Sequence, residues 1–199
     1  MFIQYHGCFF SPKARMNSLP AKTRHILWLD MEMTGLDVAR DRILEVAVVL
    51  TDMNLENITL GPSLVIYQPE DILQAMGSWC KKHHSESGLL DRVRESTVSI
   101  AAAEGMILSF LKEYGVDMPF LGGNTVYQDR LFLSQYMRSL VECLHYRQID
   151  VSSVKELVLA WYSDNKHATF SKKKGHRAQD DIIESIEELK HYRRYFFTQ

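Results

Sequence analysis

Short apolar runs alternate with amphipathic stretches along the chain, and the first three runs predict strands. Residues 26–29 are apolar and lead into Asp30, and the Val- and Ile-rich residues 43–50 predict the strongest strand. Residues 64–67 predict a third strand that ends before Pro69. Three consecutive strands joined by short polar segments predict an antiparallel meander in the amino-terminal half.

The rest of the chain alternates helical and strand patterns. Apolar residues recur at helical spacing in four segments, namely 101–114, 130–137, 154–161 and 180–195. Short apolar segments between them predict strands at 120–122 and 148–151. Ser152 or Ser153 is placed to cap the third helix. Strands followed by alternating strands and helices predict one α/β domain around a mixed sheet.

Net charge and cysteine spacing argue against several classes of protein. The net charge is −2, whereas proteins that track long nucleic acids usually carry a basic stripe, so we expect few phosphate contacts. Cys8, Cys80 and Cys143 are widely spaced and form no CxxC pattern. This spacing argues against a disulfide framework or a zinc knuckle and fits a reducing compartment. No apolar run approaches the length of a membrane span.

The first 29 residues contain basic and hydroxyl side chains and no carboxylate, because Asp30 is the first acid. A basic, acid-free leader of this kind is typical of a mitochondrial transit peptide. The same composition also fits a tail without regular structure, or an upstream extension that precedes a start at Met16.

Two carboxylates follow the first predicted strand. Asp30 and Glu32 are two residues apart, so in a strand their side chains share one face. Acids held together beside an apolar strand are costly unless a positive charge lies between them. Hard oxygen ligands suit Mg²⁺ or Mn²⁺, which makes this pair a candidate metal site. The alternative is a pair of solvated acids in a loop.

Further acids lie near predicted helix starts. Asp129 follows the strand-to-helix junction GGNTVYQ, where it also fits a plain helix cap. In the segment HRAQDD, His176 is suited to act as a general base near neutral pH. Helical spacing favours Asp180 as its partner, four residues on. If His176 lies in the loop before the helix, Asp181 can point inward instead.

Taken together, these clusters resemble the oligoribonuclease branch of the DEDD exonuclease superfamily, histidine subtype. The resemblance rests on WLDMEMTGLD, GGNTVYQDRLFLSQYM, HYRQIDVSSVKEL and HRAQDDIIESIEELKHYR, within residues 26–197. It implies a ribonuclease H-like α/β fold, a mixed sheet flanked by helices. It also implies 3′-to-5′ hydrolysis of short RNA oligonucleotides, especially dinucleotides, to 5′-mononucleotides. We therefore expect residues 1–25 to form a flexible extension, with a transit peptide as one interpretation, and residues 26–199 to form the exonuclease domain.

The resemblance also assigns roles to the acids. It implies that the metal ligands are Asp30, Glu32, Asp129 and Asp181, and that His176 is the general base. Two divalent cations, Mg²⁺ or Mn²⁺, would then clamp the attacking water and the leaving 3′ oxygen.

Other positions match substrate contacts of the family. Leu36 resembles the residue that wedges against the terminal bases, and Trp79 and His84 resemble contacts to the base and the scissile region. Thr125 keeps a hydroxyl where the family often has Ser. The residues that resemble a cup for the 5′ phosphate, reaching in from a partner subunit, are Tyr146, Arg147, Ser152 and Lys155. The resemblance therefore implies a homodimer.

Two other functions fit the same residues. One is a less length-restricted exonuclease acting on single-stranded RNA or DNA, and the HYRQIDVSSVKEL block argues against it. The other is a nucleic-acid-binding protein of the same fold without catalysis, and the complete set of acids with His176 argues against that. The leader and the resemblance together leave the mitochondrion and the cytoplasm as locations.

Overall fold

A five-stranded mixed sheet, in the order β3-β2-β1-β4-β5, forms the centre of the computed structural model, which describes residues 24–171 and 178–197. The strands are β1 (His25–Met33), β2 (Ile43–Asp52), β3 (Ile58–Val65), β4 (Phe120–Gly123) and β5 (Gln148–Asp150). The helices of the first half are α1 (Glu70–Ala75), α2 (Ser78–Glu86), α3 (Leu89–Glu95) and α4 (Ile100–Glu113). Those of the second half are α5 (Tyr127–Tyr136), α6 (Arg138–Cys143), α7 (Val151–Trp161) and α8 (Ala178–Phe196). Among the described residues, no helix is both long and apolar enough to cross a membrane.

Strand β1 is the middle strand and joins the two halves of the sheet. It pairs antiparallel with β2, which in turn pairs antiparallel with β3, so the predicted meander is confirmed. On its other side β1 pairs parallel with β4, and β4 pairs parallel with β5. The carboxyl ends of β1, β4 and β5 therefore meet at one edge of the sheet, and the predicted α/β fold with a mixed sheet is confirmed.

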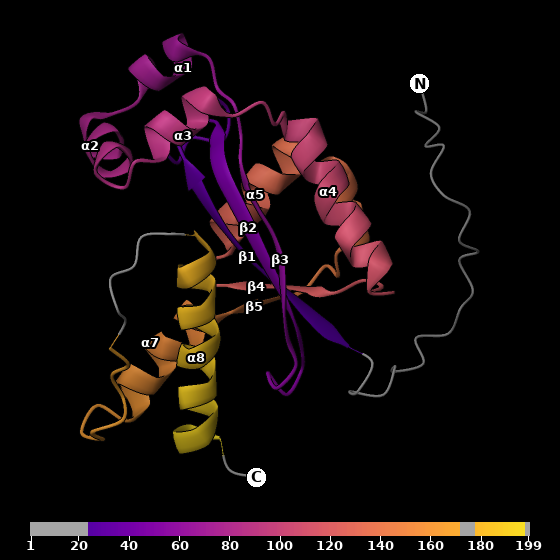
Figure 1. Ribbon diagram of the computed structural model, residues 1–199. Coiled ribbons are helices and arrows are strands. Elements are labelled where there is room, and N and C mark those ends of the chain that lie inside the picture. The colour runs from indigo at the N-terminus through magenta and orange to yellow at the C-terminus, as the bar shows by residue number, and fades with distance from the viewer. Residues whose placement is uncertain (1–23, 172–177, 198–199) are drawn as a thin grey trace, which may run out of the picture.

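The two faces of the sheet are covered by different helices (Figure 1). Because side chains alternate along a strand, Leu27 and Leu29 of β1 face the core that includes α4 and α5. Ile26 and Trp28 face the opposite core, to which α7 and α8 contribute. The Trp28 indole N–H is also satisfied, because it donates to the Thr51 hydroxyl oxygen at 2.9 Å. Burial on both faces fixes the register of β1 and hence the direction of each following side chain.

The third strand differs from the prediction, because it begins at Ile58 rather than at residue 64. Gly61 and Pro62 interrupt the sequence pattern there, and the register between β2 and β3 shifts at this point. Strand β3 lies at the edge of the sheet, where proline and bulges are tolerated because the outer N–H groups need no partner strand.

Some helices also differ from the prediction. Helix α7 begins at Val151 and is capped by Asp150, whose side chain accepts from the Ser152 amide, so neither Ser152 nor Ser153 is the cap. Helices α1, α2, α3 and α6 were not predicted. Each has nine residues or fewer, too short for a helical period to stand out in the sequence.

We predict that two leucines of α5 differ sharply in their contribution to stability. Leu133 has no exposed surface, whereas Leu131 is 48% exposed. Leu133→Ala should lower the free energy of unfolding by about 2–5 kcal/mol, because it leaves a cavity in the core. Leu131→Ala should change it by no more than about 0.5 kcal/mol. Urea unfolding followed by circular dichroism at one protein concentration measures both, and equal losses would contradict the assigned orientation of α5.

Candidate active site

Two carboxylates lie at the carboxyl-terminal end of the middle strand, β1. Asp30 and Glu32 lie within its last four residues, and their side chains share the face of the sheet on which Trp28 is buried. The segment before them is fully buried, so the strand carries the acids from the core to a half-exposed position. The structure thus places both acids on an ordered strand and not in a solvated loop.

Helix α8 brings a third carboxylate to this pair. Oxygens of Asp30, Glu32 and Asp181 all lie within 4.8 Å of one another. Asp181 lies in the first turn of α8, where the helix dipole favours a negative charge. Asp180 lies in the same turn but is exposed and outside this group. The structure therefore places Asp181, and not Asp180, beside Asp30 and Glu32, although helical spacing alone favoured Asp180.

A fourth carboxylate reaches β1 from helix α5. Asp129 lies in the first turn of α5, is 7% exposed, and accepts a hydrogen bond from the amide of Met31, the residue between Asp30 and Glu32. Burial raises the pKa of Asp129 to about 7, and the nearby charges of Asp150 and Glu32 add to this rise. Asp129 is not part of the tight group of three, but it lies directly beside the strand that carries two of them.

The electrostatic environment of Glu32 favours a bound positive charge. Burial raises its pKa to about 7, with further contributions from Glu45 and Asp181, while Arg92 acts in the opposite direction. Glu45 lies directly opposite Glu32 across β1 and β2 and is 4% exposed. The Arg92 guanidinium donates to both Glu45 oxygens, at 3.0 and 3.4 Å, and so balances that buried charge.

A cation is therefore a natural partner for the group formed by Asp30, Glu32 and Asp181. Their donor set consists of carboxylate oxygens alone, which suits a hard divalent cation. The residues present thus fit a divalent metal ion, and such an ion would offset the repulsion among them.

His84 of α2 adjoins the acids and is held as a neutral side chain. It is 5% exposed, and burial lowers its pKa. Its Nε2 lies 2.9 Å from the Met33 carbonyl oxygen, so this nitrogen carries the proton and donates. Its Nδ1 is 3.8 Å from a Glu32 oxygen and is left as an acceptor. The residue thus lies beside the acids with an unprotonated nitrogen toward Glu32.

Two predicted base contacts are large apolar side chains left open to solvent. Leu36, in the segment after β1, is 71% exposed, and Trp79 of α2 is 68% exposed. Trp79 stacks on His83, with ring centroids 4.4 Å apart. Exposed apolar side chains of this kind are suited to contact bases, which stack on apolar and aromatic surfaces.

Hydroxyl groups gather where β4 and β5 end. The Asp150 carboxylate accepts from the amides of Thr125 and Ser152, both at 3.0 Å. The Thr125 and Ser152 hydroxyl oxygens consequently lie 3.1 Å apart. Thr125 has φ of 53°, an unusual left-handed conformation that the Asp150 contact holds in place. Lys155 follows Ser152 by three residues on α7, so both lie on one side of that helix.

The remaining predicted phosphate contacts lie elsewhere in the same chain. Tyr146 and Arg147 precede β5, whereas Ser152 and Lys155 follow it, so the two pairs lie at opposite ends of this strand. Tyr146 is 66% exposed, and the Arg147 guanidinium lies over its ring at 5.2 Å. His176 lies outside the described residues.

Several residues of the site were not singled out from the sequence. Glu45 is a charged residue inside the otherwise apolar segment ILEVAVVL, and this isolated charge was the available signal. Arg92 and Gln128 carry no comparable signal, because their partners Glu45 and the Leu36 backbone are distant in the sequence.

Comparison with known proteins agrees with this geometry. A family model described as "Exonuclease" matches residues 27–189. The mitochondrial oligoribonuclease of Homo sapiens is 43% identical over 187 residues, which cover 94% of this chain and 79% of that protein. The oligoribonuclease of Haemophilus ducreyi is 46% identical over 183 residues, covering 91% and 98%.

Solved structures share the fold at lower identity. Exonuclease I of E. coli in complex with a dA16 oligonucleotide matches with a TM-score of 0.67 and 16% identity, over 87% of this chain and 41% of that one. Exonuclease I from Methylocaldum szegediense matches with a TM-score of 0.66, 17% identity and the same coverage. The extent of the family match and the identity to both oligoribonucleases show that the chain belongs to the exonuclease family and, within it, to the oligoribonucleases.

Proposed function

We propose that the protein is a metal-dependent 3′-to-5′ exoribonuclease that hydrolyses short RNA oligonucleotides, especially dinucleotides, to 5′-mononucleotides. The observation that carries this proposal is that carboxylate oxygens of Asp30, Glu32 and Asp181 lie within 4.8 Å of one another at the carboxyl-terminal end of β1. The identity of 43% to 48% with oligoribonucleases over most of the chain supports the substrate class.

The proposed metal ligands are Asp30, Glu32, Asp129 and Asp181, and we infer that they hold two divalent cations, Mg²⁺ or Mn²⁺. When bound, such ions activate a water molecule and stabilise the charge on the leaving oxygen. The raised pKa values of Glu32 and Asp129 mean that these acids favour a neighbouring positive charge, either a proton or a metal ion. His176 is the proposed general base, and this role rests on the sequence.

The substrate side of the site is proposed from exposure and hydrogen bonding. Leu36 and Trp79 expose most of their apolar surface and would contact the bases. His84 would accept a hydrogen bond from the substrate through Nδ1, since its Nε2–H is already used by the Met33 carbonyl. A site with so few contacts suits a ligand of one or two phosphates, which agrees with the net charge of −2.

The 5′ phosphate is proposed to bind at the hydroxyl groups of Thr125 and Ser152, with Lys155 supplying a positive charge. Tyr146 and Arg147 lie at the other end of β5 within one chain, so we propose that a partner subunit supplies them. Such a homodimer would close the site and limit the length of the RNA that fits.

An apolar groove supports the proposed homodimer. Leu157, Trp161 and Phe197 line it, and these side chains are 46%, 69% and 56% exposed. Apolar side chains gathered in this way commonly mark a protein interface. The groove includes α7, the helix that carries Ser152 and Lys155, so a partner bound there would lie near the proposed phosphate contacts.

The mitochondrion or the cytoplasm is the proposed location. Relatives include both a mitochondrial oligoribonuclease and bacterial oligoribonucleases. A reporter fused to residues 1–29 tests the leader, and a purely diffuse signal would remove the transit peptide from the proposal.

The first prediction from this function concerns substrate length. The wild type should degrade a 5′-labelled diribonucleotide much faster than a 5′-labelled 20-mer, and only with a divalent cation present. Loss of residues that merely orient a metal ligand costs about 10- to 100-fold. Asp181→Ala, which removes a ligand, should therefore lower kcat for the diribonucleotide more than about 100-fold, whereas Asp180→Ala should remain close to wild type.

The same measurement tests the two alternative functions, a less length-restricted exonuclease and a nucleic-acid-binding protein without catalysis. Equal cleavage of the two substrates would favour a less length-restricted exonuclease. RNA binding by the folded wild type without cation-dependent turnover would favour a binding protein and contradict the proposal.

A second prediction concerns stability and pH. The pKa of Glu32 is about 7 in the folded protein and 4.5 as its ordinary value, so between these values the folded state binds protons that the unfolded chain has released. Without metal, the free energy of unfolding should therefore fall as the pH rises from about 4.5 to about 7. Glu32→Gln should make the free energy of unfolding depend less steeply on pH in this range, and the exposed control Glu95→Gln should not.

Adding Mg²⁺ or Mn²⁺ should raise the stability of the wild type most above pH 7, because the acids are then free of protons. Chemical unfolding at several pH values measures both effects. A slope that persists unchanged in Glu32→Gln would argue against this carboxylate as its source.

A third prediction concerns the homodimer. Light scattering should give twice the mass of one chain for the wild type. Trp161→Glu places a charge in the apolar groove and should shift the mass toward that of a single chain, with a higher KM for a 5′-phosphorylated dinucleotide. Tyr114→Glu, at an aromatic residue that is 50% exposed outside this groove, is the matched control. A wild type with the mass of one chain would count against the dimer.

A further inference from the structure

The segment between β1 and β2 presents Leu36 on a tightly fastened turn. Leu36 is 71% exposed, whereas Thr34 and Asp41 on either side of it are 3% and 7% exposed. The Leu36 side chain therefore gains little from packing, and its position depends on how the backbone of this segment is held. The contacts that hold it come from Asp41 and from helix α5.

Asp41 closes the segment from within. Its carboxylate accepts from the Thr34 hydroxyl at 3.0 Å and from the Asp37 amide at 2.9 Å. The Thr34 hydroxyl oxygen in turn accepts from the Arg42 amide at 2.9 Å. A Cβ atom at Gly35 would overlap the Asp41 carboxylate, so only glycine fits at that position. The base of the turn is thus fixed by side chains of the segment itself.

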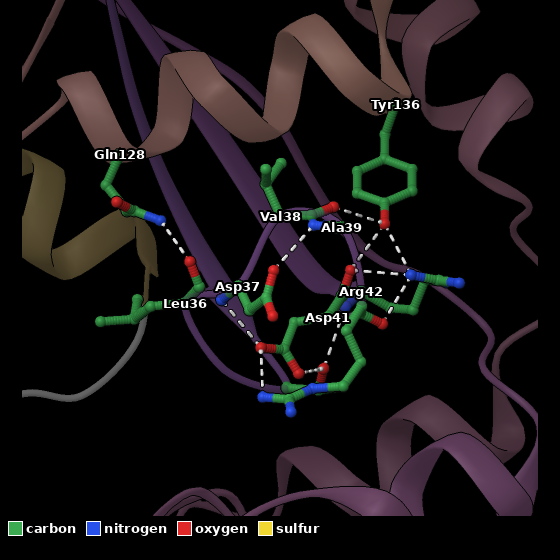
Figure 2. Close-up of polar contacts among 10 residues, drawn as sticks. Leu36, Asp37, Val38, Ala39, Asp41, Arg42, Gln128 and Tyr136 are labelled. Carbon is green, nitrogen blue, oxygen red and sulfur yellow. Dashed lines mark hydrogen bonds and ion pairs between the residues drawn. The ribbon is translucent and has the colours of Figure 1, made fainter.

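Helix α5 fastens the same segment at two further points (Figure 2). At the start of the helix, the Gln128 side-chain amide donates to the Leu36 carbonyl at 2.9 Å. At its end, the Tyr136 hydroxyl lies 2.7 Å from the Asp41 carbonyl oxygen and accepts from the Arg42 guanidinium at 2.6 Å. These two residues are eight positions apart, so their Cα atoms are separated by about 12 Å along the helix axis. The turn is therefore attached to a rigid element at both ends.

The helix that holds Leu36 also carries a proposed metal ligand. Asp129 follows Gln128 directly, and its carboxylate accepts from the Met31 amide of β1. Two neighbouring residues of α5 thus make different contacts: Gln128 binds the Leu36 backbone, and Asp129 binds strand β1. We propose that Gln128 is a positioning residue that sets the distance between the Leu36 side chain and the carboxylate site, and so orders the surface against which a substrate base packs. This inference rests on the proposed function and deepens it.

The physical effect is preorganisation of the base contact. Without the Gln128 hydrogen bond, the exposed tip of the turn has more conformations available, and binding must restrict them. That cost falls on substrate binding, because the proposed contact of Leu36 is with a base and not with the scissile phosphate. Loss of Gln128 should therefore raise KM for a substrate with bases and leave the chemical step nearly unchanged.

The test compares two glutamines of one helix. Gln128→Ala should raise KM for a diribonucleotide by about 3- to 10-fold, the value of one lost hydrogen bond, with kcat within about twofold of wild type. Gln135→Ala, at an exposed position near the other end of α5, should leave both constants unchanged. Metal-dependent cleavage of bis(p-nitrophenyl) phosphate, which has no base, should be the same in all three proteins. Loss of this base-free activity in Gln128→Ala would overturn the inference, because it would place the effect at the acids.

A double-mutant cycle tests whether Gln128 acts through Leu36. Leu36→Ala should itself raise KM, and adding Gln128→Ala should then raise it no further. Independent, multiplicative effects of the two substitutions would overturn the inference. A wild type that cleaves bis(p-nitrophenyl) phosphate but no diribonucleotide would instead overturn the proposed function.

Discussion

The repulsion among carboxylates at the end of β1 is the constraint on which the rest of the site depends. Asp30, Glu32 and Asp181 lie within 4.8 Å of one another, and Asp129 is buried beside the same strand. Burial is the main reason that the pKa values of Glu32 and Asp129 rise to about 7, and the charges of neighbouring carboxylates add to the rise. The fold must hold these acids together against that cost, and a bound cation would relieve it.

The architecture meets this constraint by placing one helix on each face of a buried strand. Helix α8 covers one face and contributes Asp181, and α5 belongs to the opposite core and contributes Asp129. Both acids lie in first turns, where helix dipoles favour negative charge. The Arg92 guanidinium balances Glu45, so one of the nearby buried charges is already compensated. Asp30, Glu32 and Asp181 form the group of carboxylate oxygens that fits a metal ion.

The proposed substrate contacts follow a different principle from the acids. The carboxylates are fixed by elements whose cores are buried, whereas Leu36 and Trp79 project into solvent and depend on the backbone beneath them. Fastening of the Leu36 turn to α5 joins these two parts of the site, because one helix contacts both. The proposed base contacts can in this way be placed precisely relative to the acids without being buried.

Much of this arrangement was predictable from the sequence, because it depends on local periodicity. The apolar segment of β2 predicted a buried strand, and the spacing of Asp30 and Glu32 predicted that they share one face. The start of β3 was not predictable, because Gly61 and Pro62 break the pattern and only the edge position of the strand accommodates them. Short helices such as α1 and α3 lacked enough turns to show a period.

The sequence by itself determined the type and order of the main elements and the face on which each strand residue lies, since both follow from interactions between near neighbours. Its helical spacing did not single out Asp181, which only the resemblance of HRAQDD to the family indicated, because adjacent helical residues point about 100° apart and the rotation of α8 is set by its packing. Nor did the sequence reveal that Arg92 balances Glu45 or that Gln128 holds Leu36. Those contacts join residues far apart in the chain, and only the packing of elements around a common core brings their atoms within hydrogen-bonding distance.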